Sequence, residues 1–360
     1  MRFLPSFIPI VLVIFFSFSS RAQVVNMALF EENVRFKVDD VIISGSLALP
    51  DTDMPYPVVV LVSGSWYDNR DAEYDGFKPF QILAEHLVEL GIAVLRYDDR
   101  GVGESTGDHT WQYTIDDYAK DVVEAAAYLK RRSDIDSSKI GVLGHSLGGN
   151  IASLAISQSE DISFFISMAG YGTNVEDFTL KMRRYIEEQT AKTSGEIEAA
   201  LALDIRLIDV AKTGKGAKKL EKDLKTQVQF EYDTLNETKK EEFEDFDDYF
   251  SSTYWGIMLE CSQTPYYSNI INYNPIPTFE KVECPTLLMF GGGDFQIPAG
   301  DHEKPITDAL DKAGNKDYKT EVIPNANHYF SDASHWGWAF SPGVLVAITE
   351  WILPKVDLEK

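Results

Sequence analysis

Ile140-Gly-Val-Leu-Gly-His-Ser-Leu-Gly-Gly149 is the most informative stretch of the chain. Its first four residues form a short apolar run, typical of a strand buried in a sheet, and a helical pattern over residues 150–158 follows at once. Between them, residues 144–148 match G-x-S-x-G, a motif that requires a strand, a tight turn and a helix. Such a turn strains the backbone of Ser146, and its flanking glycines let strand and helix approach closely. The stretch therefore predicts an exposed, reactive serine.

The same residues resemble the nucleophile elbow of the α/β-hydrolase superfamily, in particular secreted bacterial esterases of the serine aminopeptidase and dienelactone hydrolase type. The resemblance implies an α/β fold with a mostly parallel, twisted sheet, helices on both faces and a helical cap insertion. It also implies that Ser146 is the nucleophile and that the N–H of Leu147 is one donor of the oxyanion hole.

The rest of the chain fits this expectation, because strands and helices alternate from Val58 onward and predict a parallel sheet with right-handed crossovers. A hairpin over residues 34–49 precedes them. The expected strands are residues 58–62, 92–97, 140–143, 162–168, 285–290 and 318–323. The expected helices between and after them are residues 80–90, 115–131, 150–158, 305–313 and 342–353.

The alternation stops between residues 172 and 279, where charged helical patterns dominate. We expect this insertion to form a helical cap, and residues 23–171 and 280–360 to form the hydrolase core. Its expected helices are residues 177–190, 194–211, 216–232 and 239–250. Two aromatic stretches, 254–260 and 266–273, are either the surface that meets the substrate or packing within the cap.

A serine hydroxyl is a weak nucleophile at neutral pH and needs a base that is itself oriented by an acid. In the superfamily these residues follow in the order serine, acid, histidine, each after a strand. Here Asp294 comes just past Phe290 in a Gly-Gly-Gly-Asp turn, and His328 comes five residues past Ile323. We therefore predict Ser146, His328 and Asp294 as a catalytic triad.

The other histidines and carboxylates fit these roles less well. Asp301 and Asp332 do not directly follow a strand, and His302 and His335 are expected at the surface. His335 comes just before tryptophans at 336 and 338, so lining the site is its alternative position. His145, beside the nucleophile, is expected to turn away from the serine.

The loop after the strand at 58–62 is the usual source of the second oxyanion donor. Related esterases often carry Ser-Gly-Ser-Gly followed by Asp-Arg-Asp there, and this chain keeps Ser63-Gly-Ser65 and Arg70-Asp71 but has Trp66-Tyr67 in the middle. By position the N–H of Ser65 is the expected donor. Trp66, His145 and Tyr171 are the candidates for lining the substrate site.

Asp98-Asp-Arg-Gly-Val-Gly-Glu-Ser105 resembles the superfamily's D-x-R-G-x-G-x-S turn. We interpret this turn as structural, with Arg100 tying loops together through two-pronged contacts. A phosphate-binding loop is disfavoured because the G-x-G-x-x-G pattern is absent from the sequence.

The formal net charge of −24 argues against nucleic acid or an anionic membrane as a partner. Residues 1–22 combine Arg2, an apolar run and Ser20-Arg-Ala22, which predicts a signal peptide, export to a periplasm or the outside, and no stable membrane insertion after cleavage. The two cysteines, Cys261 and Cys284, leave pairing open, and no spacing indicates a metal site or a cofactor.

The sequence thus predicts a serine hydrolase that cleaves small acyl esters of short or medium chain length through an acyl-enzyme. Two alternatives stay open. One is a cap-gated serine aminopeptidase, and the other is a non-catalytic binding protein on a hydrolase fold. The oligomeric state is not predicted.

Overall fold

The computed structural model describes residues 30–65, 68–108, 111–190, 192–332 and 339–358, and the signal peptide expected over 1–22 lies outside them. An eight-stranded sheet in the order β1-β2-β4-β3-β5-β6-β7-β8 forms its centre. β1 and β2 make the expected antiparallel hairpin, β2 pairs antiparallel with β4, and all further pairs are parallel. The strands are β1 Phe30–Val38, β2 Val41–Leu49, β3 Tyr56–Val62, β4 Ala93–Tyr97, β5 Ile135–His145, β6 Phe164–Met168, β7 Thr286–Gly291 and β8 Tyr318–Ile323.

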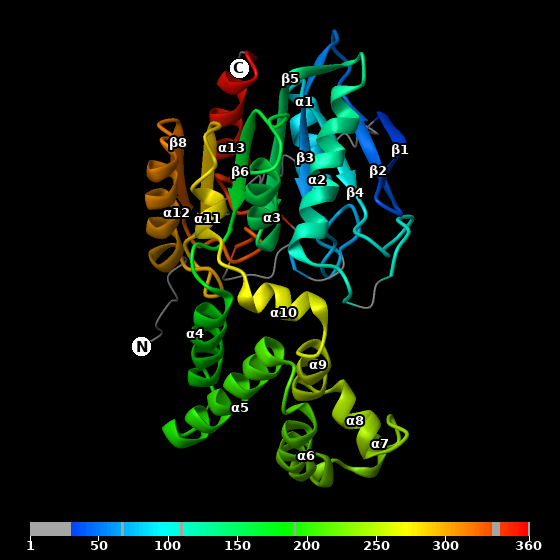
Figure 1. Ribbon diagram of the computed structural model, residues 1–360, viewed down its shortest axis with the longest axis vertical. Coiled ribbons are helices and arrows are strands. Elements are labelled where there is room, and N and C mark those ends of the chain that lie inside the picture. Colours follow the sequence, from blue (N-terminus) through cyan, green and yellow to red (C-terminus); the bar gives the residue numbers. More distant parts are fainter. Residues whose placement is uncertain (1–29, 66–67, 109–110, 191, 333–338, 359–360) are drawn as a thin grey trace, which may run out of the picture.

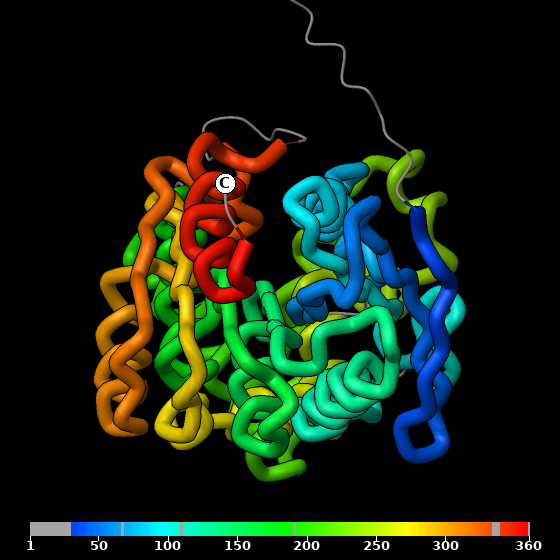
Figure 2. Tube along the Cα trace, turned by 90° about the horizontal axis from the view of Figure 1, so that it is seen from above, coloured from blue at the N-terminus to red at the C-terminus, as the bar shows by residue number. Residues whose placement is uncertain are grey.

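Helices cover both faces of the sheet, as predicted for the fold (Figures 1 and 2). On one face lie α1 Pro79–Glu89 and α13 Val344–Ile352, which contact each other. α13 continues into the short 3-10 helix η1 Leu353–Lys355. On the other face lie α2 Ile115–Lys130, α3 Leu147–Ile156, α11 Ile276–Phe279 and α12 Ala299–Ala313. Every residue of β3, β4, β6 and β7 is buried, because strands covered on both faces can be apolar throughout.

The chain between β6 and β7 forms a helical insertion that lies beyond one end of the sheet (Figure 1). Its helices are α4 Val175–Glu188, α5 Ser194–Thr213, α6 Ala217–Thr234, α7 Glu237–Lys240, α8 Phe246–Ser252, α9 Tyr254–Cys261 and α10 Pro265–Asn272, followed by α11. Part of this insertion has a hydrophobic cluster of its own. That cluster comprises Leu207, Val210, Leu220, Leu224, Val228, Phe250, Trp255 and Leu259.

Two helices differ from the sequence predictions. The helix expected to begin at Pro305 begins at Ala299, with the proline inside it. Proline often marks the first turn of a helix, but burial of His302 on the preceding turn favours the earlier start here. The single helix expected over 239–250 is two, α7 and α8, because the Asp245 carboxylate accepts the Asp248 N–H and so starts a new helix.

Both cysteines are free in the structure, Cys261 buried and Cys284 partly so. Within the residues that the structure describes, no helix combines the length and apolarity that crossing a bilayer requires.

Candidate active site

Ser146 occupies a strained turn between β5 and α3. Its backbone has φ 54° and ψ −124°, a conformation that costs a non-glycine residue about 1–3 kcal/mol. Hydrogen bonding fixes it, since the Ser146 N–H donates to the carbonyl of Met168 at 2.8 Å. A Cβ added to Gly144 would lie 2.2 Å from the Gly148 carbonyl oxygen, and one added to Gly148 would lie 2.3 Å from that of Ser63. The glycines of the motif are therefore required by close backbone packing.

Three side chains from three loops meet at this turn. The Ser146 Oγ lies 3.0 Å from Nε2 of His328, and Nδ1 of the same ring lies 2.8 Å from Oδ2 of Asp294. A carboxylate only accepts, so Nδ1 carries a proton and Nε2 is free to accept the proton of the serine hydroxyl. The order is the one that a general base needs in order to activate a hydroxyl nucleophile.

Asp294 is held as an anion although it is buried. Burial by itself would raise its pKa, but hydrogen bonding and charge interaction with His328, and the N–H groups of Ile297 and Gln296, hold the pKa below the ordinary value. Both N–H groups donate to Oδ1, at 3.0 and 2.8 Å. Oδ2 is thus left to the histidine, and the two oxygens have separate tasks.

His145 holds the backbone of His328 through a hydrogen bond. Its Nε2–H donates to the carbonyl of His328 at 2.8 Å, and the two rings lie 5.0 Å apart. Burial, followed by the charge of His328, lowers the pKa of His145 to about 4, so its imidazole stays neutral. His145 therefore positions the histidine loop.

The N–H of Leu147 begins α3 and so has no carbonyl one turn earlier to donate to. Ser65, in the loop after β3, lines a pocket together with Ser146 and His328. This loop is anchored from beneath, because the Ser63 hydroxyl donates to the buried carboxylate of Asp99 at 2.8 Å and the N–H of Asp68 donates to it at 3.0 Å. The expected oxyanion donors thus sit on two fixed elements that flank the serine.

A pocket of about 580 Å³ opens over Ser146 and is bounded by both the sheet loops and the insertion. On the insertion side it is apolar and aromatic. Apart from Thr179, the residues there are Val175, Phe178, Met182, Tyr254, Met258, Cys261, Tyr266, Tyr267 and Ile270. Insertion and serine therefore form one site.

Comparison with known proteins agrees with this fold. A family model described as serine aminopeptidase, S33, matches residues 75–241. Esterase EstD of Thermotoga maritima is 24% identical over 284 residues, which are 79% of this chain and 57% of that protein. The α/β hydrolase GrgF from Penicillium sp. sh18 superposes with a TM-score of 0.55 at 13% identity, covering 91% of this chain and 99% of that one. The ferulic acid complex of Est1E from Butyrivibrio proteoclasticus gives 0.53 at 17% identity, with 90% and 99% covered.

The chain has the α/β-hydrolase fold, and a little under half of it matches the serine aminopeptidase family model. It spans little more than half the length of the Thermotoga esterase, so the comparison with that protein covers only part of it.

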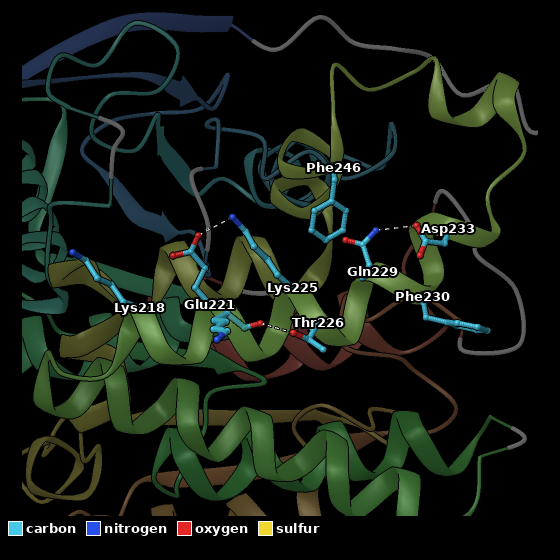
Figure 3. A pocket seen from close by; sticks show the side chains of 9 residues that line it. Lys218, Glu221, Lys225, Thr226, Gln229, Phe230, Asp233 and Phe246 are labelled. Carbon is cyan, nitrogen blue, oxygen red and sulfur yellow. Dashed lines mark hydrogen bonds and ion pairs between the residues drawn. The ribbon is translucent and has the colours of Figure 1, made fainter.

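A second hollow, about 650 Å³, is lined mainly by residues of α6 (Figure 3). Lys225 pairs with Glu221 there at 2.9 Å, and Gln229 donates to Asp233 at 2.9 Å. In both pairs the polar side chains are bound to each other, and no triad residue lines the hollow. The pocket over the serine is therefore the candidate active site.

The structure brings together most of the residues singled out in the sequence. Ser65, His145 and Tyr171 line the pocket with the serine and His328, and the backbone of Tyr171 is bonded to Asn150. Trp66 and His335 lie outside the described residues. His302, expected at the surface, is wholly buried, with its Nδ1 accepting the N–H of Gly172 at 3.1 Å.

Sequence reasoning missed part of the pocket, namely Asp68, Tyr74 and Tyr329. The rings of Tyr74 and Tyr329 stack with centroids 4.8 Å apart. Tyr329 directly follows the predicted base, which was the one available signal. In the described part of the chain, no three His, Cys, Asp or Glu side chains gather as metal ligands would.

Proposed function

We propose that the protein hydrolyses carboxylic esters through an acyl-enzyme formed on Ser146. The observation that carries the proposal is the aligned serine, histidine and aspartate, joined by distances of 3.0 and 2.8 Å. His328 takes the hydroxyl proton as Oγ bonds to the ester carbon, then gives that proton to the departing alcohol. A water molecule, deprotonated by the same histidine, next attacks the acyl-enzyme, and the acid leaves as Ser146 regains its proton.

Charge that develops on the carbonyl oxygen is stabilised by the N–H groups of Leu147 and Ser65. Removing one such donor typically costs about 3 kcal/mol of transition-state stabilisation. The elbow supports this role, since its fixed backbone holds the donor in place before substrate arrives and little reorganisation is needed during the reaction.

The helical insertion acts as a cap that shapes the acyl site. A pocket of about 580 Å³ with an apolar insertion side supports esters of short or medium acyl chains. Two similar proteins, EstD and Est1E, are an esterase by name and a protein solved with ferulic acid, which is in keeping with small organic acids as the acyl part. The N-terminal sequence supports export of the enzyme to a periplasm or the outside.

An aminopeptidase is the second candidate, because the matching family model is described as serine aminopeptidase. The same triad would attack an amide, and the leaving group would be an amine. Faster hydrolysis of aminoacyl p-nitroanilides than of matched p-nitrophenyl esters would favour it.

Hydrolysis of p-nitrophenyl esters from acetate to decanoate, by the wild type and by Ser146→Ala, tests the proposal. We expect activity in the wild type and a loss of about a thousandfold or more in the variant, because no other side chain replaces the nucleophile. Labelling by a fluorophosphonate in the wild type alone would identify the serine. Equal rates in both proteins would contradict the proposal, and a folded wild type that neither hydrolyses esters nor labels would favour a binding protein.

A further inference from the structure

The pocket over Ser146 is uneven in charge. Among the described residues that line it there is no lysine and no arginine, and its carboxylates are Asp68 and Glu73. The chain as a whole carries a formal net charge of −24. A pocket of this kind disfavours an anionic substrate, since nothing in its described lining compensates a negative charge.

The two carboxylates differ in their surroundings. Glu73 is exposed and lies 3.4 Å from the ammonium of Lys78. Asp68 is partly buried, and no described lysine or arginine forms an ion pair with it. Arg70, the cation of the same loop, forms an ion pair with Asp98 at 2.6 Å. Asp68 is thus a carboxylate inside the pocket without a compensating cation.

Asp68 also lies close to the reacting centre. Its carboxyl group accepts a hydrogen bond from the N–H of Gly64. Gly64 is packed against the nucleophile, because a Cβ added to it would lie 3.3 Å from the Cβ of Ser146. Gly64 therefore contacts both Asp68 and the nucleophile, and Asp68 and Ser146 line the same pocket.

Aromatic rings complete this side of the pocket. Tyr329 is near enough to Asp68 for their charges to interact, and it stacks on Tyr74 at 4.8 Å. The ring of Tyr329 also lies 5.7 Å from that of His328, so the stack borders the base. A carboxylate beside tyrosine rings is a setting that attracts an organic cation through both charge and the ring faces.

We propose that Asp68, with Tyr74 and Tyr329, forms a subsite for a protonated or quaternary amine of the ester substrate. This inference rests on the proposed esterase function and narrows it to cationic esters. Burial raises the pKa of Asp68 to about 7, and the hydrogen bond from the Gly64 N–H opposes this rise. The raised pKa means that the ionised carboxylate is disfavoured, at a cost in free energy, when no cation lies beside it. An ammonium group on the substrate would remove that cost.

Matched esters test the proposal and locate the amine. Ethyl 6-aminohexanoate and ethyl heptanoate differ by a charge on the acyl side, and choline hexanoate and 3,3-dimethylbutyl hexanoate differ by a charge on the alcohol side. We expect kcat/KM to favour the cation by ~10-fold or more in one of the two pairs, the range of a charge-assisted contact. The arm that shows the preference identifies the side that carries the amine.

Asp68→Asn keeps the shape and the acceptor for Gly64 but removes the charge. We expect it to abolish the preference for the cationic ester of the pair, mainly by raising KM of that ester. Glu73→Gln is the matched control and should keep the preference. In the wild type, pentyltrimethylammonium should inhibit hydrolysis of the neutral ester competitively and pentyl sulfate should not, which tests the subsite without any variant.

Serine-dependent hydrolysis of the neutral esters with no cation preference in either pair overturns the subsite and leaves the esterase intact. A folded Asp68→Asn enzyme that keeps the preference overturns the subsite in the same way. Absence of Ser146-dependent hydrolysis with all four esters overturns the esterase and the subsite together.

Discussion

Replacing Asp294 by asparagine changes one oxygen for an NH₂ group, and the surroundings decide which one. Oδ1 accepts the N–H groups of Gln296 and Ile297 at 2.8 and 3.0 Å. An NH₂ group cannot face two donors, so the asparagine must keep its oxygen there. Its NH₂ group is then forced toward Nδ1 of His328, where the carboxylate oxygen Oδ2 was.

That orientation selects the wrong tautomer of the histidine. The NH₂ group donates to Nδ1, which must therefore lose its proton, and the proton moves to Nε2 opposite the Ser146 hydroxyl. The base then has no free lone pair for the serine proton. The same exchange in a Ser-His-Asp triad lowers kcat by about ten-thousandfold, and at 1.36 kcal/mol for each factor of ten this is about 5.5 kcal/mol of transition-state stabilisation.

The assay is hydrolysis of p-nitrophenyl butyrate at saturating substrate by the wild type and Asp294→Asn. Asp301→Asn is the matched control, because Asp301 is the neighbouring carboxylate and pairs with Lys181 at the surface, so its kcat should stay within about twofold. Thermal melts establish that both variants are folded. A folded Asp294→Asn enzyme that retains more than about a tenth of wild-type kcat would refute the role assigned to the carboxylate.

Two further changes test the scaffold, both by urea unfolding followed by tryptophan fluorescence. Gly148→Ala should destabilise the fold by about 1–3 kcal/mol or more, since the new Cβ would lie 2.3 Å from backbone oxygens. Gly300→Ala is the control, because a Cβ there has nothing within 4 Å, and it should be neutral or stabilise the fold by up to about 1 kcal/mol. Equal effects of the two substitutions would contradict the packing explanation. Arg100→Met should lower the free energy of unfolding by about 3–5 kcal/mol, because it leaves the buried Asp121 without its two 2.7 Å hydrogen bonds. The double variant Arg100→Met with Asp121→Leu should recover much of that stability. If it recovers none, a buried unpaired charge is not the cause of the loss.

The catalytic residues could be predicted from the sequence because each is a residue type with suitable chemistry that comes shortly after a predicted strand. Ser146 and Asp294 follow strands whose final residues are buried and read as apolar runs. His328 follows β8, an edge strand that is mostly part-exposed, and it was found from its place after that strand and after Asp294 in the chain. The expected two-pronged contact of Arg100 is present for a similar reason, because a guanidinium in a glycine turn next to a helix has few other partners. Position relative to the sheet therefore carried the prediction.

What the sequence did not reveal depends on contacts between distant segments. Tyr74 and Tyr329 stack although they are more than 250 residues apart along the chain, and neither lies in a periodic pattern. The surface position expected for His302 is wrong because the start of α12 was set at Pro305, which removed the turn that carries the histidine inward. A local sequence pattern holds no information on contacts between distant segments. The reacting groups could therefore be predicted from the sequence, but the residues of the pocket wall could not.

The insertion wall is fixed by charges that do not touch the triad. The guanidinium of Arg183 lies 4.4 Å from the ring centre of Tyr254, and the Tyr254 hydroxyl donates to Asp204 at 2.7 Å. Arg183 also pairs with Glu187 at 2.7 Å, and both acids are nearly wholly buried. Because Tyr254 lines the pocket, this network sets the shape of the wall from within the insertion.

Sheet and insertion therefore divide the work of the site. The triad rests on loops after β5, β7 and β8, whose packing belongs to the sheet core, whereas the wall rests on α4, α9 and α10. Part of the insertion, including Trp255 beside the wall residue Tyr254, packs in a cluster separate from that core. Substitutions within that cluster should thus alter which ester is bound before they alter the reacting groups, so that a loss of packing there appears first in KM and only later in kcat.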